Sequence, residues 1–124
     1  MHLPVLLPRP AIEAFERAAA TLAMAEPGTT AERVMEMMLA GFSVLDLGER
    51  LARNPIPAGP REVAYVPASR ETAADLILVG LAFNLEADEV ASRILAAIAR
   101  EGPASAIRAI NSRRAGRRAR RIKR

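Results

Sequence analysis

The chain of 124 residues contains no cysteine, so its side chains can form neither a disulfide nor a thiolate metal site. It has one histidine, His2, which stands at the terminus with no evident ligand or catalytic partner. Aromatic residues are few, namely Phe15, Phe42, Tyr65 and Phe83. A core must therefore be built from Ala, Leu, Ile, Val and Met. We expect a protein of the reducing cytoplasm that needs no cofactor or metal.

Long hydrophobic runs are also missing. The longest, Leu76–Phe83, is far shorter than the ~20 residues of a bilayer-spanning helix. The N-terminus lacks the pattern of a signal peptide. We therefore expect no membrane partner.

Motifs of catalysis are absent as well, including dinucleotide and phosphate loops, zinc-protease helices and nucleophile elbows. The carboxylates come in short-range pairs, for example Glu13 with Glu16 and Asp88 with Glu89. On helices such pairs are usually solvated or stabilise a helix start. We expect no enzymatic activity.

Positive charge is concentrated at one end of the chain. The net charge is +4, but residues 113–124 hold eight of the 18 basic residues and no acidic residue. The rest of the chain is therefore weakly acidic. Affinity for a polyanion is expected to reside mainly in this basic tail.

Residues 61–100 predict a short strand, a turn and two helices. Val63, Tyr65 and Val66 favour an extended strand, and Pro67 ends it. Ser69 is a candidate N-cap, because its hydroxyl can accept a hydrogen bond from an unpaired N–H. The helix that follows carries along one face Ala73, Leu76, Ile77, Gly80 and Asn84.

The second helix of this stretch is expected to start near Asp88, another N-cap candidate. Its apolar residues at helical spacing are Val90, Ala91, Ile94, Leu95 and Ile98. A unit of one strand and two helices cannot bury its apolar faces alone. It needs a second copy.

Residues 2–41 repeat the same order. The strand His2–Leu7 ends at Pro8, as the later strand ends at Pro67. Two further segments match in pattern: 22–24 with 81–83 and, after a one-residue slip, 32–35 with 92–95. The alternative is an ordinary helical bundle in which two strand-like segments happen to precede a proline.

The helices of the first copy follow from the same signals. One helix is expected to start at Pro10 and to end before Pro27. The residues on its inward face are Ile12, Phe15, Ala19 and Leu22. The next starts at a capping box with Thr29 as cap and Glu32 reaching back, and presents Val34, Met37, Met38 and Phe42.

This strand–helix–helix order resembles the ribbon-helix-helix superfamily of small DNA-binding proteins. As a tandem repeat it resembles the accessory proteins of DNA transfer systems, including plasmid transfer. The expected fold is mainly α with one short two-stranded antiparallel ribbon, a tandem ribbon-helix-helix pseudo-dimer in one chain whose repeats share one core. Its parts are the first repeat (1–42), a linker (43–60), the second repeat (61–101), a short helix (102–112) and the basic tail (113–124). Within the linker, a short helix is expected over 43–53.

The resemblance implies that the ribbon lies in the DNA major groove and reads base edges with its outward side chains. In this family the residue before the strand-ending proline faces inward, so Leu7 and Val66 belong to the core. Because successive side chains of a strand point to opposite faces, the outward-facing residues are then His2, Pro4, Leu6, Arg61, Val63 and Tyr65. Of these, His2, Arg61 and Tyr65 are candidate base contacts, and the apolar remainder predicts weak sequence readout.

Phosphate contacts are expected at two places. The amides that open the second helix of each repeat would hold phosphates, with Thr29 and Thr30 in the first repeat. The counterpart in the second repeat carries Glu86, Asp88 and Glu89, which repel phosphate. Both stretches are equally explained as simple helix caps. The remaining candidates are the basic residues of the tail: Arg113, Arg114, Arg117, Arg118, Arg120, Arg121, Lys123 and Arg124.

DNA binding, in an accessory or transcription-regulating role, is the leading hypothesis. The competing hypothesis is a protein-interaction module with the same fold, which binds a partner or itself through Leu76–Phe83, apolar on every face. The tail is also compatible with RNA contact or with a purely solubilising role.

Overall fold

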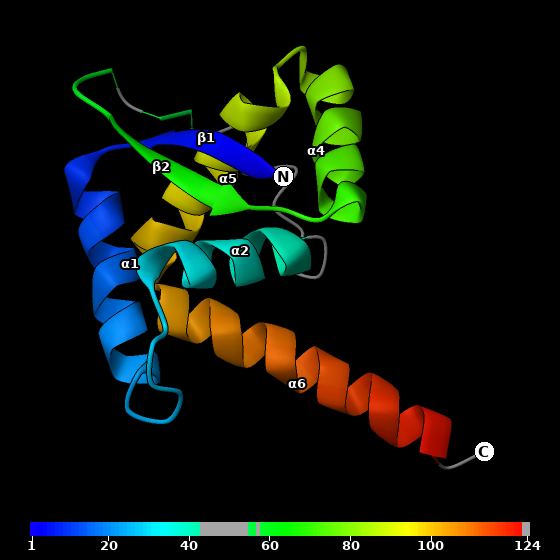
Figure 1. Cartoon of the computed structure of the whole chain (residues 1–124). Coiled ribbons are helices and arrows are strands. Elements are labelled where there is room, and N and C mark those ends of the chain that lie inside the picture. Colours follow the sequence, from blue (N-terminus) through cyan, green and yellow to red (C-terminus); the bar gives the residue numbers. More distant parts are fainter. Residues whose placement is uncertain (43–54, 57, 123–124) are drawn as a thin grey trace.

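The structure is a computed structural model that describes residues 1–42, 55–56 and 58–122, of which 113–122 as backbone only. Its elements in chain order are β1 (His2–Leu7), α1 (Arg9–Leu22), α2 (Ala31–Gly41), β2 (Glu62–Pro67), α4 (Arg70–Phe83), α5 (Ala87–Glu101) and α6 (Pro103–Ile122). The described part is mainly helical with one two-stranded sheet (Figure 1). The short helix predicted over 43–53 lies outside the described residues.

The two strands pair antiparallel, which confirms the predicted ribbon. Leu3 lies opposite Val66, and Val5 lies opposite Ala64. These four residues are buried, as is Leu7, whereas their neighbours in sequence face out. The predicted inward orientation of Leu7 and Val66 is therefore confirmed. A strand buries alternate residues, so one face of the ribbon rests on the core and the other meets solvent.

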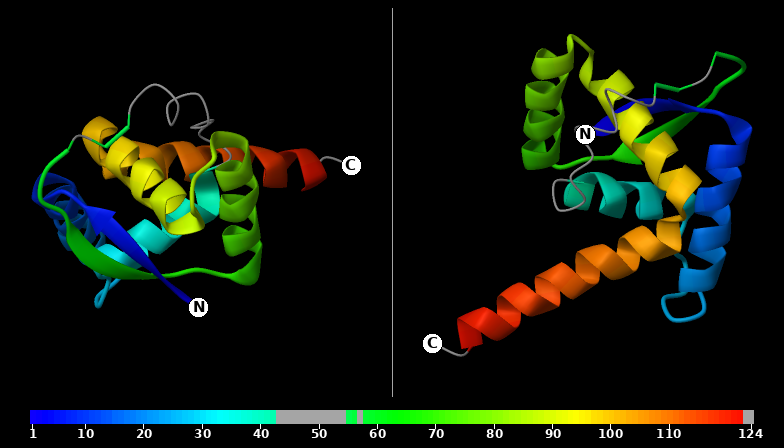
Figure 2. Two further views of the ribbon diagram at one scale, coloured as in Figure 1. Left: turned by 90° about the horizontal axis from the view of Figure 1, so that it is seen from above. Right: turned by 180° about the vertical axis from the view of Figure 1, so that it is seen from behind.

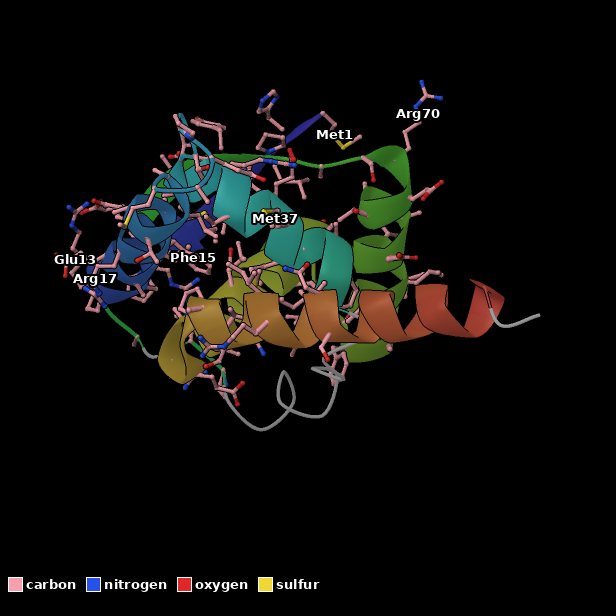
Figure 3. The ribbon with its side chains drawn as sticks, turned by 90° about the horizontal axis from the view of Figure 1, so that it is seen from below. Met1, Glu13, Phe15, Arg17, Met37 and Arg70 are labelled. Carbon is pink, nitrogen blue, oxygen red and sulfur yellow. The ribbon has the colours of Figure 1, made fainter. Side chains whose placement is uncertain are left out.

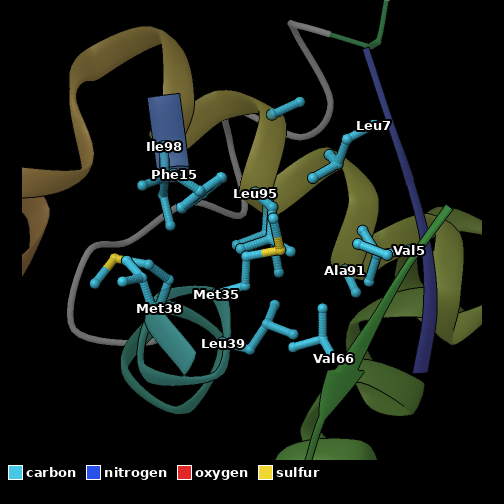
Figure 4. Close-up of a cluster of buried hydrophobic side chains, with 14 of the residues drawn as sticks. Val5, Leu7, Phe15, Met35, Met38, Leu39, Val66, Ala91, Leu95 and Ile98 are labelled. Carbon is cyan, nitrogen blue, oxygen red and sulfur yellow. The ribbon is translucent and has the colours of Figure 1, made fainter. Parts of the chain in front are cut away.

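The buried face of the ribbon rests on α2 and α5. β1 packs mainly on α5, β2 packs on α2, and α1 contacts both of these helices. Figure 4 shows the side chains of Val5, Val66, Met35 and Leu95 converging between the ribbon and the helices. The core is built from aliphatic residues and methionine, with Phe15 and Phe42 as its aromatic members. These are residue types that are usually buried, as expected from the composition.

The inward stripes of α1 and α5 are confirmed. Ile12, Phe15 and Ala19 are buried and Leu22 is partly buried, and the five predicted residues of α5 are all buried. For α2 the prediction is incomplete. Val34 and Met38 are buried as expected, but Met35 and Leu39 are also buried, and Met37 is only partly covered. The helix is covered by the ribbon, α1, α5 and α6, so more than one of its faces is buried.

α6 forms a further layer beneath α2, on the side away from the ribbon (Figure 1). Ile107 and Ile110 are buried and Ala106 is partly buried, as their spacing predicts. A side chain at Gly41 would come within 2.6 Å of the Cδ1 atom of Ile110. Glycine at this position therefore permits the close approach of α2 and α6.

The predicted end of this last helix at residue 112 is wrong, because α6 continues to Ile122. Its final turns extend beyond the helices that it packs on (Figure 2). Arg and Ala, which dominate residues 113–122, are strong helix formers, and the isolated Gly116 does not end the helix. Residues 113–122 of the basic tail are therefore a continuous extension of a packed helix.

Two predicted helix caps are corrected. α2 is capped by Thr30, whose hydroxyl accepts a hydrogen bond from the Arg33 N–H at 3.2 Å. Thr29 instead donates its hydroxyl proton to the Glu26 carbonyl at 2.7 Å. This bond closes the turn that Gly28 makes at φ 90°, so the helix starts one residue later than the predicted capping box. α5 begins at Ala87, which places Asp88 in the first turn rather than at the cap.

The α4–α5 turn explains that earlier start. Asn84 adopts a left-handed conformation with φ 57°, which ends α4 and redirects the chain at once. A side chain at Gly80 would come within 2.4 Å of the Leu85 carbonyl oxygen. Leu85 donates its N–H to the Gly80 carbonyl at 2.8 Å. Gly80 thus allows a very tight turn between the helices.

The N-cap at Ser69 is confirmed, because its hydroxyl oxygen accepts from the Thr72 N–H at 3.1 Å. We expect Ser69→Ala to lower the free energy of unfolding by about 1 kcal/mol, since an orphan N–H of α4 loses its partner. Chemical denaturation followed by circular dichroism measures this difference. Ser69→Asp, which also accepts at an N-cap, is the control and should retain most of the stability. Equal losses in both variants would contradict a capping role.

Candidate nucleic-acid interface

The outer face of the ribbon is largely apolar. Pro4 lies opposite Tyr65, and Leu6 lies opposite Val63. All four side chains are exposed, Tyr65 by 61%. His2 is also exposed and lies opposite Pro67 at the end of the ribbon. The predicted outward set is therefore in place on the ribbon itself, where His2 and Tyr65 are the polar members.

Arg61, by contrast, does not lie on this face. It precedes β2, and its guanidinium is 3.3 Å from a carboxylate oxygen of Glu89 in the first turn of α5. The other oxygen of Glu89 contacts Arg93 at 3.4 Å. The Arg61 side chain is only 25% exposed. The structure thus turns the strongest predicted base contact toward the protein.

Sequence reasoning identified Glu89 only as a carboxylate that repels phosphate and missed its role as a partner of Arg61. Its pairing with Arg93 has the i,i+4 spacing that is visible in the sequence. Its contact with Arg61 joins residues far apart in the chain and had no local signal. In the fold, the Glu89 carboxylate forms ion pairs with both Arg61 and Arg93, so the positive charge of each arginine is compensated.

The surroundings of Arg9, at the same end of the ribbon as Arg61, are also unfavourable to phosphate. Arg9 contacts carboxylates of Glu62 at 3.2 Å, Glu13 at 3.4 Å and Glu16 at 3.6 Å. The hydrogen bond with Glu62, together with the charge of Glu16, raises the pKa of the Arg9 guanidinium. One cation among three carboxylates leaves this end negative. At this end of the ribbon, Arg9 and Arg61 are therefore both compensated by carboxylates.

The start of α2 combines an exposed helix N-terminus, as expected of a phosphate anchor, with a carboxylate in its first turn, Glu32, which opposes an anion. Thr30 is exposed at the N-terminal end, where the helix dipole favours an anion. Arg33, in the first turn, forms an ion pair with Glu36. The hydroxyls of Thr29 and Thr30 already have partners within the turn. These bonds explain both residues as elements of local structure, and a phosphate would add to that role.

The start of α5 is acidic, as predicted. Asp88 and Glu89 occupy its first turn, and Glu86 precedes it. Ser92, in the second turn, is buried and accepts a hydrogen bond from the Leu6 N–H at 3.0 Å. It donates in turn to the Asp88 carbonyl at 2.7 Å. This end of α5 therefore supports β1 and is not an anion site.

The basic segment of α6 is the largest concentration of positive charge. With 3.6 residues per turn, its six arginines between 113 and 121 fall within one arc of about 160° around the helix axis. Ala115, Ala119 and Ile122 fall on the opposite side. A helix with one cationic side suits the backbone of a duplex, whose charge is regularly spaced.

No group of three or more His, Asp or Glu residues in the described part is placed to hold a metal ion. None of the described helices is long and apolar enough to cross a bilayer.

Comparison with protein-family models, with curated proteins and with solved structures finds no match to this chain. The site must therefore be interpreted from its own residues.

Proposed function

We propose that this protein binds DNA, with affinity mainly from the basic segment of α6 and a minor contribution from the ribbon. The observation that carries the proposal is the ribbon itself. Two strands from different halves of the chain pair above two helices and leave one face open to solvent. A two-stranded ribbon of this kind fits the DNA major groove.

We further propose that the two halves are tandem ribbon-helix-helix repeats. Val5 pairs with Ala64, and each stands three residues before its proline, Pro8 or Pro67. The local two-fold axis would therefore run through this pair. The crossed packing supports the same relation, because β1 lies on α5 while β2 lies on α2. The symmetry is incomplete, since α1 packs on α2 and α5 whereas α4 packs chiefly on α5.

The basic segment supplies the affinity in this proposal. Each arginine that neutralises a phosphate releases condensed counterions, which favours binding to any duplex sequence. Around the ribbon, Arg9 and Arg61 are already compensated by carboxylates. The segment and the ribbon lie on different sides of α2 (Figure 1). A duplex held by the segment is thus not automatically placed on the ribbon.

Base readout through the ribbon is expected to be weak. A good bidentate contact contributes about 1–3 kcal/mol of discrimination, and it needs a polar side chain matched to a base edge. On its outward face the ribbon offers His2 and Tyr65 for this purpose, beside Pro4, Leu6 and Val63. Apolar side chains can contact thymine methyl groups but accept or donate no hydrogen bond.

We therefore expect Arg61→Ala and Tyr65→Ala each to change the affinity for random duplex DNA by less than about threefold, since neither removes a phosphate contact of the tail. Fluorescence anisotropy with a labelled duplex measures this, and selection from a random duplex pool measures specificity. Arg9→Ala, at the same end of the ribbon as Arg61, is a matched loss of one compensated arginine. A strongly enriched sequence whose binding is lost in Arg61→Ala or Tyr65→Ala would contradict weak readout.

A protein-interaction module is the second candidate function, and the apolar outer face of the ribbon favours it. Val63, Leu6 and Tyr65 form a surface that would pack against a hydrophobic partner. A chain ending at residue 112 distinguishes the two functions. If the ribbon binds a protein partner, this truncated chain should still bind it. The same truncation should abolish DNA binding.

A further inference from the structure

The ribbon presents two outer edges, one along β1 and one along β2. In an antiparallel pair, alternate residues turn their N–H and C=O groups to the partner strand, and the residues between them turn these groups outward. Ala68 donates its N–H to the Met1 carbonyl at 2.9 Å, at the end of the ribbon where Figure 3 shows Met1. Counting in steps of two from this pair, Ala64 bonds to β1. Its neighbours Val63 and Tyr65 therefore turn their backbone groups to the outer edge of β2.

The edge of β1 is closed by the protein itself. The Leu6 N–H donates to the Ser92 hydroxyl of α5 at 3.0 Å. This bond agrees with the same alternation, because it requires the Leu6 N–H to point away from β2. Pro4, two residues earlier on the same edge, has no N–H to donate. An added strand would find one donor absent and the other already used.

The edge of β2 is not closed in this way. Within the described residues, no hydrogen bond reaches the outward N–H and C=O groups of Val63 and Tyr65. The matched segments of the two halves place Glu32 where the second half has Ser92. Glu32 is exposed, and no hydrogen bond joins it to β2 in the described part of the chain. Two donors and two acceptors of one strand are thus available to a partner.

These groups specify the kind of partner that fits. Donors and acceptors that alternate at a spacing of two residues complement the backbone of an extended strand. A helix cannot satisfy them, because its own backbone groups are bonded within the helix. Val63 is 49% exposed and Tyr65 is 61% exposed beside this edge. Cross-strand neighbours on one face interact best when they are β-branched or aromatic, so the two residues opposite these side chains should be apolar.

We propose that the outer edge of β2 binds an extended segment of a partner protein as a third strand, antiparallel to β2. The segment carries apolar side chains at the two alternate positions that bond to Val63 and Tyr65. Antiparallel pairing is slightly more stable per residue than parallel pairing. The inference rests on the second candidate function, protein interaction through the ribbon, and defines the partner for it. It does not depend on DNA binding by α6.

Hydrogen exchange of the full chain, followed by nuclear magnetic resonance, tests whether the edge is open. In the chain alone, the amides of Ala64 and Val66 should exchange at least about tenfold more slowly than those of Val63 and Tyr65. The peptide acetyl-Lys-Thr-Val-Thr-Val-Thr-Lys-amide, added at saturation, should slow the exchange at Val63 and Tyr65. Equal protection of all four amides without the peptide would overturn the proposal, because a closed edge cannot accept a strand.

Two N-methylated forms of this peptide distinguish strand addition from contact with the outer face of the ribbon. Methyl groups on the two valine nitrogens remove the donors that face β2 and should raise the dissociation constant at least about tenfold. Methyl groups on two threonine nitrogens point away from β2 and should change it by less than about threefold. Chemical-shift titration of the wild-type chain measures both constants, so this test does not depend on how a variant folds.

A substitution in the chain removes a donor from the other side of the contact. Val63→Pro deletes one outward N–H without deleting a bond between β1 and β2, and it should weaken peptide binding at least about tenfold. Val63→Thr keeps the N–H and the β-branched shape and is the matched control. Equal affinity for the two methylated peptides would overturn strand addition and leave contact with the apolar face as the mode of binding. Absence of binding at millimolar peptide would overturn both.

Discussion

Removal of residues 113–124 is expected to abolish most of the affinity for duplex DNA while leaving the folded body intact. These residues carry eight basic side chains and no acidic one, and the rest of the chain has more acidic than basic residues. If all eight contact phosphates, the slope of log affinity against log salt concentration falls in magnitude by up to about 7 on truncation. The loss at physiological salt should then exceed about a hundredfold.

The body survives because the contacts that hold α6 precede the cut. Ile107 and Ile110 remain buried against α2 and its neighbours. A variant with the six arginines of 113–121 replaced by glutamine is the matched control, since glutamine keeps helix propensity and removes only the charge. Anisotropy titrations at several salt concentrations compare the full, truncated and neutral chains. If the truncated chain binds as tightly as the full chain at the same salt, the tail is not the source of affinity.

Leu95→Ala should destabilise the fold by about 2–5 kcal/mol, through lost transfer energy and the cavity that remains. Leu95 is fully buried, and Figure 4 shows it among the buried side chains of the core. Denaturant titration of dilute protein gives the difference in free energy of unfolding. Leu81→Ala removes the same atoms from an exposed position and should cost less than about 0.5 kcal/mol. Equal costs at the two positions would mean that α5 does not present Leu95 to the core.

The sequence predicted the ribbon and the buried faces of α1 and α5 because these depend on local alternation and helical spacing. The antiparallel pairing of the two strands was predicted from their similar context before a proline, but the register that pairs Val5 with Ala64 was not. Hydrophobic periodicity survives tertiary packing when an element buries one face only. The fold class was accessible for this reason.

What the sequence could not give depends on contacts between distant elements. Ile77 shares a predicted helix face with Leu76 and Gly80, but among the described elements α4 packs chiefly on α5, and Ile77 is exposed. The same limit applies to the candidate site. Arg61 has the chemistry of a base contact, and only the folded chain brings Glu89 beside it. The length of α6 was underestimated because the arginine run was interpreted as a tail rather than as good helix formers.

The register of the ribbon has a consequence for the order of folding. Leu7 pairs with Glu62 and His2 pairs with Pro67, so every pair joins the first residues to a strand halfway along the chain. Closing so long a loop costs entropy that local helix contacts do not, and such pairings slow folding. During synthesis β1 leaves the ribosome first and has no partner strand until β2 has followed. Leu3, Val5 and Leu7 stay uncovered for that interval, which makes the N-terminal strand the segment most exposed to misassociation in the nascent chain.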